Sequence, residues 1–474
     1  MIPACAAPRR ATSPIAIWAH AIAAAATTSV VGVAFAEGSS PPPSQASEPR
    51  VALPVLRYRL ASGVRVALAP DPSLDNVSVI VRYDVGSADD PPGKDGLAHL
   101  VEHLMFGGSR HVAPGDFGRL SALAGATNVN ALTHLDDTTY TTTVPRSGLP
   151  VVFWLESDRM GFLADRLNNE TLEREKRLIA DESRDLLFDR DLGVAGAAGW
   201  LQLFPARHPY HRDRYSTHVE SCTLDDVRAF LRTWYSPSNA TIGVAGDFDA
   251  SAVRSLIEQY FGDLPGGRPP ERPDIPNGWR VHDVRIDVGA GISHDVVSVM
   301  WTAPALDQPG DAALDLAANI LADGEGRLQN DLVSPGLASS VSARESSYRR
   351  ASQFWISAVA SDGAAEAVAA ALDRAVADLG ERVRPEEYRR AHDEWFDESM
   401  FRLQTSLGRA FHLVRTGAPE VPWELDKYDA IGPAEVAAAV RSNLIPDHRV
   451  VLVVHHDRQY SVQGVVLSRK ERLP

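Results

Sequence analysis

Hydrophobic residues recur along this chain with two different periods. In some segments they occupy every second position, and in others every third or fourth position. The runs 77–83 and 240–247 alternate apolar and polar side chains or are continuously apolar, and both are rich in β-branched residues, which predicts strands. The run 223–235 repeats apolar residues at helical spacing and predicts a helix leading into the second of these strands. The patterns predict an α+β protein in which strands pack against amphipathic helices.

The same order of elements recurs in the second half of the chain. A repeated order of helices and strands is typical of an internal duplication, so we expect two homologous α/β units, each a mostly antiparallel sheet flanked by helices. The predicted strands correspond as 77–83 with 297–302 and 240–247 with 449–455. The predicted helices correspond as 223–235 with 432–444 and 97–105 with 311–321.

A proline-rich stretch separates the two predicted units. Prolines and glycines between 265 and 276 interrupt both periodic patterns, which is typical of a linker between domains. We therefore predict an N-terminal domain at 51–264, a linker at 265–278 and a C-terminal homologous domain at 279–474, joined in a clamp-like arrangement.

Residues 1–36 differ from the rest of the chain. Arginines precede an apolar, alanine-rich stretch at 15–35, a small-x-small site occupies 34–36, and no acidic residue occurs before Glu37. This layout is typical of a secretory signal peptide and predicts export to a bacterial periplasm. A mitochondrial presequence leading to the matrix, an uncleaved membrane anchor and twin-arginine export are the alternatives. Residues 37–50 are predicted to form a disordered tether.

Composition limits the partners and the chemistry. The chain has 474 residues, 44% hydrophobic and 23% charged, which is typical of a globular protein of two or three domains. Its formal net charge of −15 disfavours nucleic acid and anionic membrane surfaces as partners. Cys5 and Cys222 are the only cysteines, and loss of 1–36 would leave one. Any metal ligands are therefore expected from histidines and carboxylates.

One short predicted helix carries metal-binding chemistry. Apolar residues at helical spacing run from 97 to 105, before two glycines that end the helix. His99 and His103 stand one turn apart, so both imidazoles can reach one divalent ion, with Glu102 beside them. His-x-x-Glu-His is the inverted zinc-peptidase motif, in which the carboxylate takes a proton from water. Chance proximity on an exposed helix is the alternative, and a third ligand would decide between them.

A second helix, predicted at 172–186, offers the third ligand. Its apolar stripe includes Glu175 and Glu182, and burying unpaired carboxylates is costly, so a cation is expected beside them. A single Zn²⁺ per chain fits this requirement, with Glu182 as the third ligand and Glu175 as the hydrogen-bond acceptor that orients a ligand histidine. The alternative is a helix whose glutamates pair with arginines or reach solvent.

These motifs together resemble the pitrilysin/insulinase family of zinc metallopeptidases, and the length and layout resemble its processing-peptidase-like bacterial subgroup. The family follows His-x-x-Glu-His with a Glu-Arg-Glu-x6-Glu helix, and here 173–175 and Glu182 match that pattern. The resemblance implies a zinc endopeptidase for extended or unfolded peptides. In it, Glu102 is the general base, Glu175 fixes the ligand geometry, and His99, His103 and Glu182 hold the metal.

The stretch 127–144 is rich in β-branched residues and predicts an edge hairpin or a long strand. The resemblance implies that this strand accepts the substrate backbone as an added strand. It places Asn130, Ala131 and Thr133 along the substrate cleft and Tyr140 in support of it. An ordinary exposed, threonine-rich strand is the alternative.

The second half departs from the family pattern. Active members carry an Arg and a Tyr there that bind the substrate carbonyl, but the matching segment, 327–340, has Val333 and Ser339 at those positions. The resemblance therefore implies a heterodimer in which a homologous subunit supplies the missing pair, with a homodimer as the alternative. The rival function is a non-catalytic peptide-binding or assembly subunit of the same family.

Overall fold

The computed structural model describes residues 54–188, 193–212, 218–268, 270–272, 279, 281–290, 292–415, 424–456 and 466–468. The predicted signal peptide and tether lie outside these residues, as does much of the predicted linker. All described elements belong to one compact unit, Leu53–Pro474. Among the described helices, none combines the length and the apolar character needed to span a bilayer.

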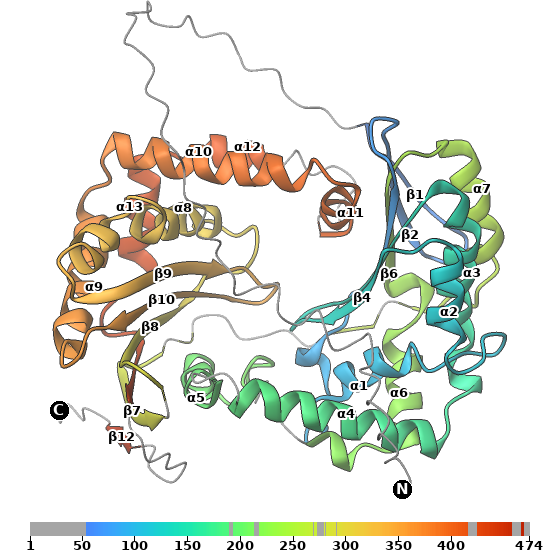
Figure 1. The fold of residues 1–474 in the computed structure, drawn as a ribbon, viewed down its shortest axis with the longest axis horizontal. Helices are drawn as coiled ribbons and strands as arrows, with labels where there is room; N and C mark the ends of the chain where they lie inside the picture. The colour runs from blue at the N-terminus through green and yellow to red at the C-terminus, as the bar shows by residue number, and fades with distance from the viewer. Residues whose placement is uncertain are drawn as a thin grey trace, which may run out of the picture. The chain divides into compact units, whose positions relative to one another are not determined.

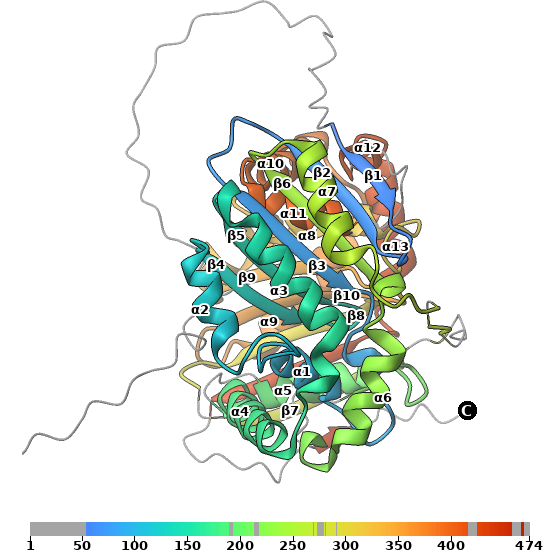
Figure 2. The same ribbon diagram turned by 90° about the vertical axis from the view of Figure 1, so that its right-hand side faces the viewer.

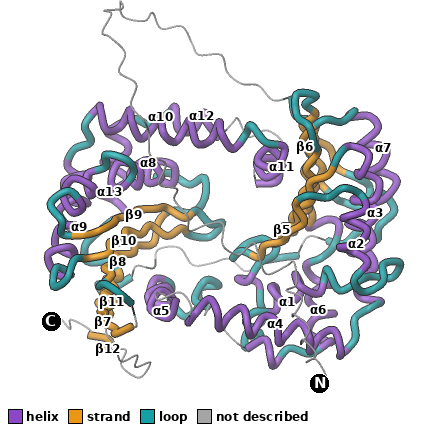
Figure 3. The backbone as a smooth tube through the Cα atoms, in the orientation of Figure 1, coloured by secondary structure: helices purple, strands orange, loops and turns teal. Residues whose placement is uncertain are grey.

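Two six-stranded sheets form the framework, shown as separate groups of strands in Figure 3. The first sheet has the order β1-β2-β6-β3-β5-β4. Only the β2–β6 pair is parallel, and β4 is an edge strand. The strands are β1 Leu56–Arg59, β2 Arg65–Pro70, β3 Val77–Tyr83, β4 Asn128–Thr133, β5 Thr138–Val144 and β6 Ala240–Gly246.

The second sheet repeats this topology. Its order is β12-β7-β11-β8-β10-β9, with the β7–β11 pair parallel and the other pairs antiparallel. From β2 and β7 onward, the two sheets have the same strand order and directions, which confirms two homologous units. The strands are β7 Val284–Ala290, β8 Val296–Ala303, β9 Ala338–Ser346, β10 Ser352–Ala360, β11 Val450–His456 and β12 Val466–Ser468.

Thirteen α-helices occur among the described residues, seven in the first half of the chain and six in the second. Those of the first half are α1 Leu97–Leu104, α2 Asp116–Leu123, α3 Leu149–Phe162, α4 Asn169–Phe188, α5 Gly193–Leu203, α6 Leu224–Trp234 and α7 Ala250–Phe261. Those of the second half are α8 Asp311–Ala322, α9 Ala365–Glu381, α10 Pro385–Arg402, α11 Ser406–Arg415, α12 Glu424–Asp429 and α13 Pro433–Asn443. The predicted helices at 223–235, 311–321 and 432–444 are therefore confirmed within two residues.

Each sheet carries helices of its own half on one face. Because side chains alternate along a strand, Val66 and Leu68 of β2 face the core shared with α3 and α7, while Ala67 and Ala69 face the other way. Figure 2 shows α3 and α7 crossing in front of this sheet. In the second sheet, one face of β8 and β11 packs in the same way against α8, α9 and α13.

The opposite face of each sheet is covered by a helix from the other half. Helix α11 packs on β2, β3 and β6 (Figure 1), and α5 packs on β7, β8 and β11. Gly243 of β6 permits the first contact, because a Cβ there would lie 2.7 Å from a Val414 methyl group. No local pattern in the sequence predicts that each sheet receives a helix from the other half, because this packing depends on the path of the whole chain. The predicted boundary at 265–278 therefore stays a prediction.

Candidate metal centre

Helix α1 begins and ends where the sequence predicts. Gly96 adopts the left-handed conformation at its N-cap (φ 94°), and the Asp90 carboxylate accepts hydrogen bonds from the Gly96 and Ala98 amides at 2.8 and 2.7 Å. A carboxylate at this end also interacts favourably with the helix dipole. The helix is followed by Gly108, whose φ of 105° favours glycine. Its apolar face is fully buried through Leu97, Leu100 and Val101.

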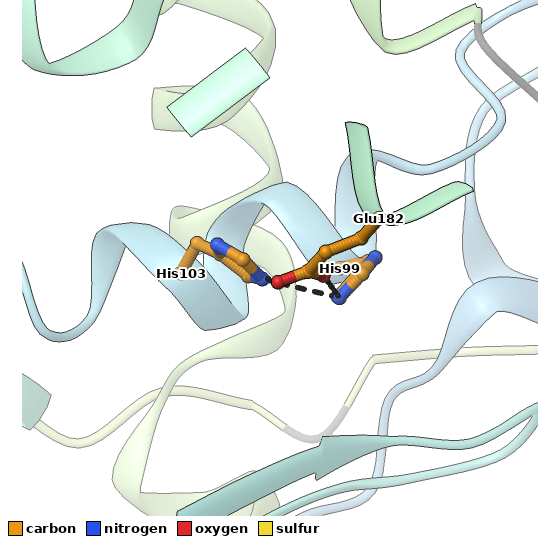
Figure 4. Close-up of side chains that lie close together, drawn as sticks. All are labelled: His99, His103 and Glu182. Carbon is orange, nitrogen blue, oxygen red and sulfur yellow. Dashed lines mark hydrogen bonds and ion pairs between the residues drawn. The ribbon is translucent and has the colours of Figure 1, made fainter. Parts of the chain in front are cut away.

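Helix α4 packs against α1 and brings the predicted third ligand to the two histidines. The Nε2 atoms of His99 and His103 lie 3.2 Å apart, and Glu182 Oε2 lies 3.6 Å from the first and 3.5 Å from the second. Figure 4 shows the two imidazoles and the carboxylate pointing toward one another. These residues form the one candidate metal group with three donors among the described residues.

The geometry fits a zinc ion. Nitrogen and oxygen ligands bind zinc at about 2.0–2.2 Å in tetrahedral geometry, which separates ligand atoms by about 3.3–3.6 Å. The three measured separations, 3.2–3.6 Å, agree with that spacing. Two imidazoles and one carboxylate are also a donor set that zinc accepts, and they leave a fourth position open.

Glu175 lies beside His103, the residue whose imidazole it is predicted to orient. Its Oε2 is 3.4 Å from His103 Nδ1, and its Oε1 accepts from the Arg174 guanidinium at 2.8–2.9 Å. Burial lowers the pKa of His103, but hydrogen bonds with Glu175 and Glu182 outweigh it and raise that pKa to about 10. The neighbouring carboxylates therefore favour a positive charge at His103, whereas burial lowers the pKa of His99. The helical pattern predicted that Glu182 is buried, but its side chain is 47% exposed.

Replacing Glu175 by Gln is expected to weaken zinc binding by about 10–100-fold while leaving the fold intact, because the carboxylate fixes the tautomer and orientation of His103. Glu173→Gln is the matched control, since that side chain is on the same helix, is 55% exposed and pairs with Lys176. Competition with a fluorescent zinc chelator measures the affinity. Equal affinities of the two variants would contradict the orienting role.

Glu102 is held beside the ligands by a contact that sequence reasoning missed. The residue is 8% exposed, and its Oε2 accepts a hydrogen bond from the Thr133 hydroxyl at 2.6 Å. Strand β4 thus meets α1 at the carboxylate. Spacing along the sequence could not reveal this contact, because 31 residues separate the partners.

The predicted substrate strand is the edge hairpin β4–β5. Asn130 is exposed on the outer strand, Ala131 is 9% exposed, and Thr133 is turned toward Glu102. Tyr140 is fully buried, with its hydroxyl 3.3 Å from that of Tyr235 and the Arg159 guanidinium 4.2 Å from its ring. Tyr140 can therefore support the hairpin from within the core but does not line a cleft.

The turn of this hairpin is fixed by residues far away in the sequence. Asp136 is buried and accepts hydrogen bonds from the Tyr210 hydroxyl and, at 2.8 Å, from the Arg349 amide of the second half. This contact gives a structural role to Tyr210, which joins the hairpin turn to the loop that follows α5. Asp136 carried no recognisable signal in the sequence.

The second unit lacks the metal residues at the matching positions. Helix α8 starts at Gly310, which has a φ of 98° like its counterpart Gly96. Counting from these two glycines places Ala313, Leu316 and Ala317 where the first unit has His99, Glu102 and His103. All three are buried in the apolar core of the second half. Val333 packs on the same core, and Ser339 is exposed on β9.

Two homologous α+β units, one with an inverted zinc motif and one without, define a class of two-unit metallopeptidase-like proteins. Comparison with protein families agrees with this class. The family described as insulinase (peptidase family M16) matches residues 65–187, and the M16 peptidase inactive domain matches residues 221–394. The chain therefore belongs to the M16 peptidase family.

Several relatives of this chain are named zinc proteases. Zinc protease PqqE of Helicobacter pylori is 27% identical over 290 residues, which is 58% of this chain and 62% of that protein. The beta subunit of the mitochondrial-processing peptidase of Blastocladiella emersonii is 25% identical over 298 residues, 59% of each chain. Both similarities thus cover less than two thirds of the relative's length.

Solved structures share the fold. A protease from Helicobacter pylori superposes with a TM-score of 0.76 at 21% identity, covering 85% of this chain and all of that one (100%). An M16-like peptidase from Alicyclobacillus acidocaldarius gives a TM-score of 0.76 at 22% identity, covering 85% of this chain and 98% of that one. At these identities the likeness establishes the two-unit architecture.

Proposed function

We propose that this protein is a zinc-dependent endopeptidase that hydrolyses extended or unfolded peptides. The observation that carries the proposal is the convergence of His99, His103 and Glu182 at zinc-ligand spacing, with Glu102 beside them. The family membership and the names of the relatives support the same reaction.

Each residue of the site has a separate role in the proposed hydrolysis. A bound zinc ion supplies a Lewis acid that polarises the scissile carbonyl and acidifies water. Glu102 takes a proton from the attacking water and passes it to the leaving amine, as a general base and then a general acid. His99, His103 and Glu182 hold the ion, and Glu175 orients His103.

The shape of the first sheet supports an extended substrate. Strand β4 is at the sheet edge, so its outward backbone groups are not paired by another described strand. An extended peptide can add to such an edge through main-chain hydrogen bonds, which read conformation more than sequence. Asn130, Ala131 and Thr133 lie on this strand, 2.6 Å from Glu102 at the closest contact, so a peptide added here would pass the metal ligands.

The finer proposal is that this chain is the catalytic subunit of a heterodimer. The motivating observation is the asymmetry between an intact metal half and a second half with Val333 and Ser339 in place of the Arg and Tyr. A related chain is named as the beta subunit of a processing peptidase, which is a multi-subunit enzyme by that name. A homodimer is the alternative arrangement. A non-catalytic assembly subunit is the alternative function, and the retained metal residues argue against it.

Export to the periplasm is proposed from residues 1–36, which lie outside the described residues. The periplasmic protease PqqL of Escherichia coli has a similar fold, with a TM-score of 0.70 at 18% identity. The location of that protein supports the proposal, with the mitochondrial matrix and an uncleaved anchor as alternatives.

The test of the function combines metal analysis with a peptide assay. We expect the purified chain to contain about one zinc per chain and, alone or with a homologous subunit, to cleave a quenched unstructured peptide. Removal of zinc by a chelator such as 1,10-phenanthroline is expected to abolish cleavage, and added zinc is expected to restore it, because the ion polarises the carbonyl. Absence of zinc, or cleavage that survives chelation, would refute the proposal.

A further inference from the structure

We propose that Thr133 is a positioning residue that holds the Glu102 carboxylate in its working orientation, a role that rests on the function proposed above. The Thr133 hydroxyl donates to Glu102 Oε2 at 2.6 Å. This length is typical of a charge-assisted O–H···O⁻ hydrogen bond, which is stronger than a neutral one. Because Glu102 is 8% exposed, water competes little for this interaction.

The hydroxyl of Thr133 has one proton and therefore one strong acceptor. Among the described residues, the only other hydroxyl within hydrogen-bond distance is that of Thr138, at the longer distance of 3.4 Å. Thr138 already uses its proton, donating to the Val85 carbonyl at 2.9 Å inside the core. Because the Glu102 carboxylate can only accept and lies closer than the Thr138 hydroxyl, the proton of Thr133 is directed to Glu102.

This contact makes the two oxygens of Glu102 inequivalent. Oε2 is engaged by Thr133, whereas Oε1 accepts no hydrogen bond from any described residue. Oε1 is also not among the sealed, unpaired polar atoms of the described residues, so solvent reaches it. We assign to Oε1 the proton transfer and to Oε2 the anchoring of the carboxylate.

The strand that carries Thr133 is itself rigidly held. The next residue, His134, begins the β4–β5 turn, in which its amide donates to the Asp137 carbonyl at 2.8 Å. Asp136 of this turn is fixed by Tyr210 and by the Arg349 amide of the second half. A side chain next to a turn that is fixed in this way can hold the rotamer of its partner more tightly than one next to an unanchored turn. Strand β4 thus has two proposed roles. Its unpaired backbone edge binds the substrate, and the Thr133 hydroxyl positions Glu102.

Thr133→Val removes the hydroxyl but preserves size and branching. We expect kcat to fall about 10–100-fold with KM changed less than about 3-fold and zinc content unchanged, since the carboxylate loses its orientation but not its charge. Thr133→Ser keeps the hydroxyl and is expected to restore kcat to within about 3-fold. Thr142→Val is the matched control, because Thr142 is buried on the same face of the sheet but pairs with Val129 rather than approaching Glu102.

Three results would overturn the positioning role: an unchanged kcat in Thr133→Val, an equal loss in Thr133→Ser, or a change in KM alone, which would indicate substrate binding instead. Crystal structures of the zinc-loaded wild type and Thr133→Val give a readout that needs no turnover. Thr133 Oγ1 is expected within about 3 Å of Glu102 Oε2 in the wild type, and the carboxylate is expected to rotate away in the variant. A carboxylate fixed in both structures would refute this role even if the chain proved not to be a peptidase.

Discussion

Glu102→Gln is expected to lower kcat for peptide hydrolysis by about 10²–10⁴-fold while zinc remains bound. The amide cannot take a proton from water at neutral pH, so the reaction loses its general base. Gln has nearly the same shape and can still accept the hydrogen bond that Thr133 now donates at 2.6 Å. The ligands His99 and His103 keep their places on α1, so zinc content is expected to match the wild type.

The measurement is steady-state cleavage of a quenched peptide together with elemental analysis of zinc. Glu170→Gln is the control, because that residue is exposed in the first turn of α4 and makes the same chemical change away from the ligands. Retained hydrolysis in Glu102→Gln would refute the assigned base. Loss of zinc together with activity would show instead that Glu102 acts through the metal ligands.

The parts of the site that could be predicted are those encoded by local periodicity. Two histidines four residues apart on a helix with a buried face must point the same way, so His99 and His103 follow from 3.6-residue spacing alone. Glu175 and Glu182 stand out for the same reason on α4. The period-two pattern also predicted a strand correctly, since β3 begins and ends at the predicted residues, Val77–Tyr83.

The parts that could not be predicted depend on contacts between distant segments. The hydrogen bond from Thr133 to Glu102 requires the pairing of β4 with β5 and the approach of α1. The anchoring of Asp136 by Arg349 spans 213 residues and joins both halves. The packing of α5 and α11 on the sheet of the other half also depends on contacts between distant segments. None of these contacts follows from a repeating pattern, because each depends on how the whole chain folds back on itself.

The expected degree of burial was also wrong at one residue. The apolar stripe of α4 predicts that both glutamates are desolvated, and Glu175 is indeed 6% exposed. The side chain of Glu182, however, is 47% exposed. Helical periodicity identifies a face but not how far along the helix that face is covered. The assignment of Glu182 as a ligand therefore relies on its distances to the histidines.

Adding a homologous subunit that carries the family Arg and Tyr is expected to raise kcat by about 10²–10³-fold for each donor that it supplies. Donors aimed at the developing negative charge on the carbonyl oxygen contribute about this much in acyl-transfer enzymes. In this chain the corresponding positions hold Val333, which is partly buried against the core, and Ser339, whose hydroxyl donates to the Val359 carbonyl at 3.5 Å. Neither side chain offers a cationic or phenolic donor to a substrate.

The experiment measures cleavage by the chain alone, by the partner alone and by the mixture, with zinc content determined for each. The mixture is expected to be active, and changing the partner's Arg to Ala or its Tyr to Phe is expected to remove most of the gain. A mixture containing Glu102→Gln is expected to be inactive, because the proton transfer takes place on this chain. Full activity of the chain alone at any concentration would refute the need for a partner, whereas activity that rises with the square of its concentration would favour the homodimer.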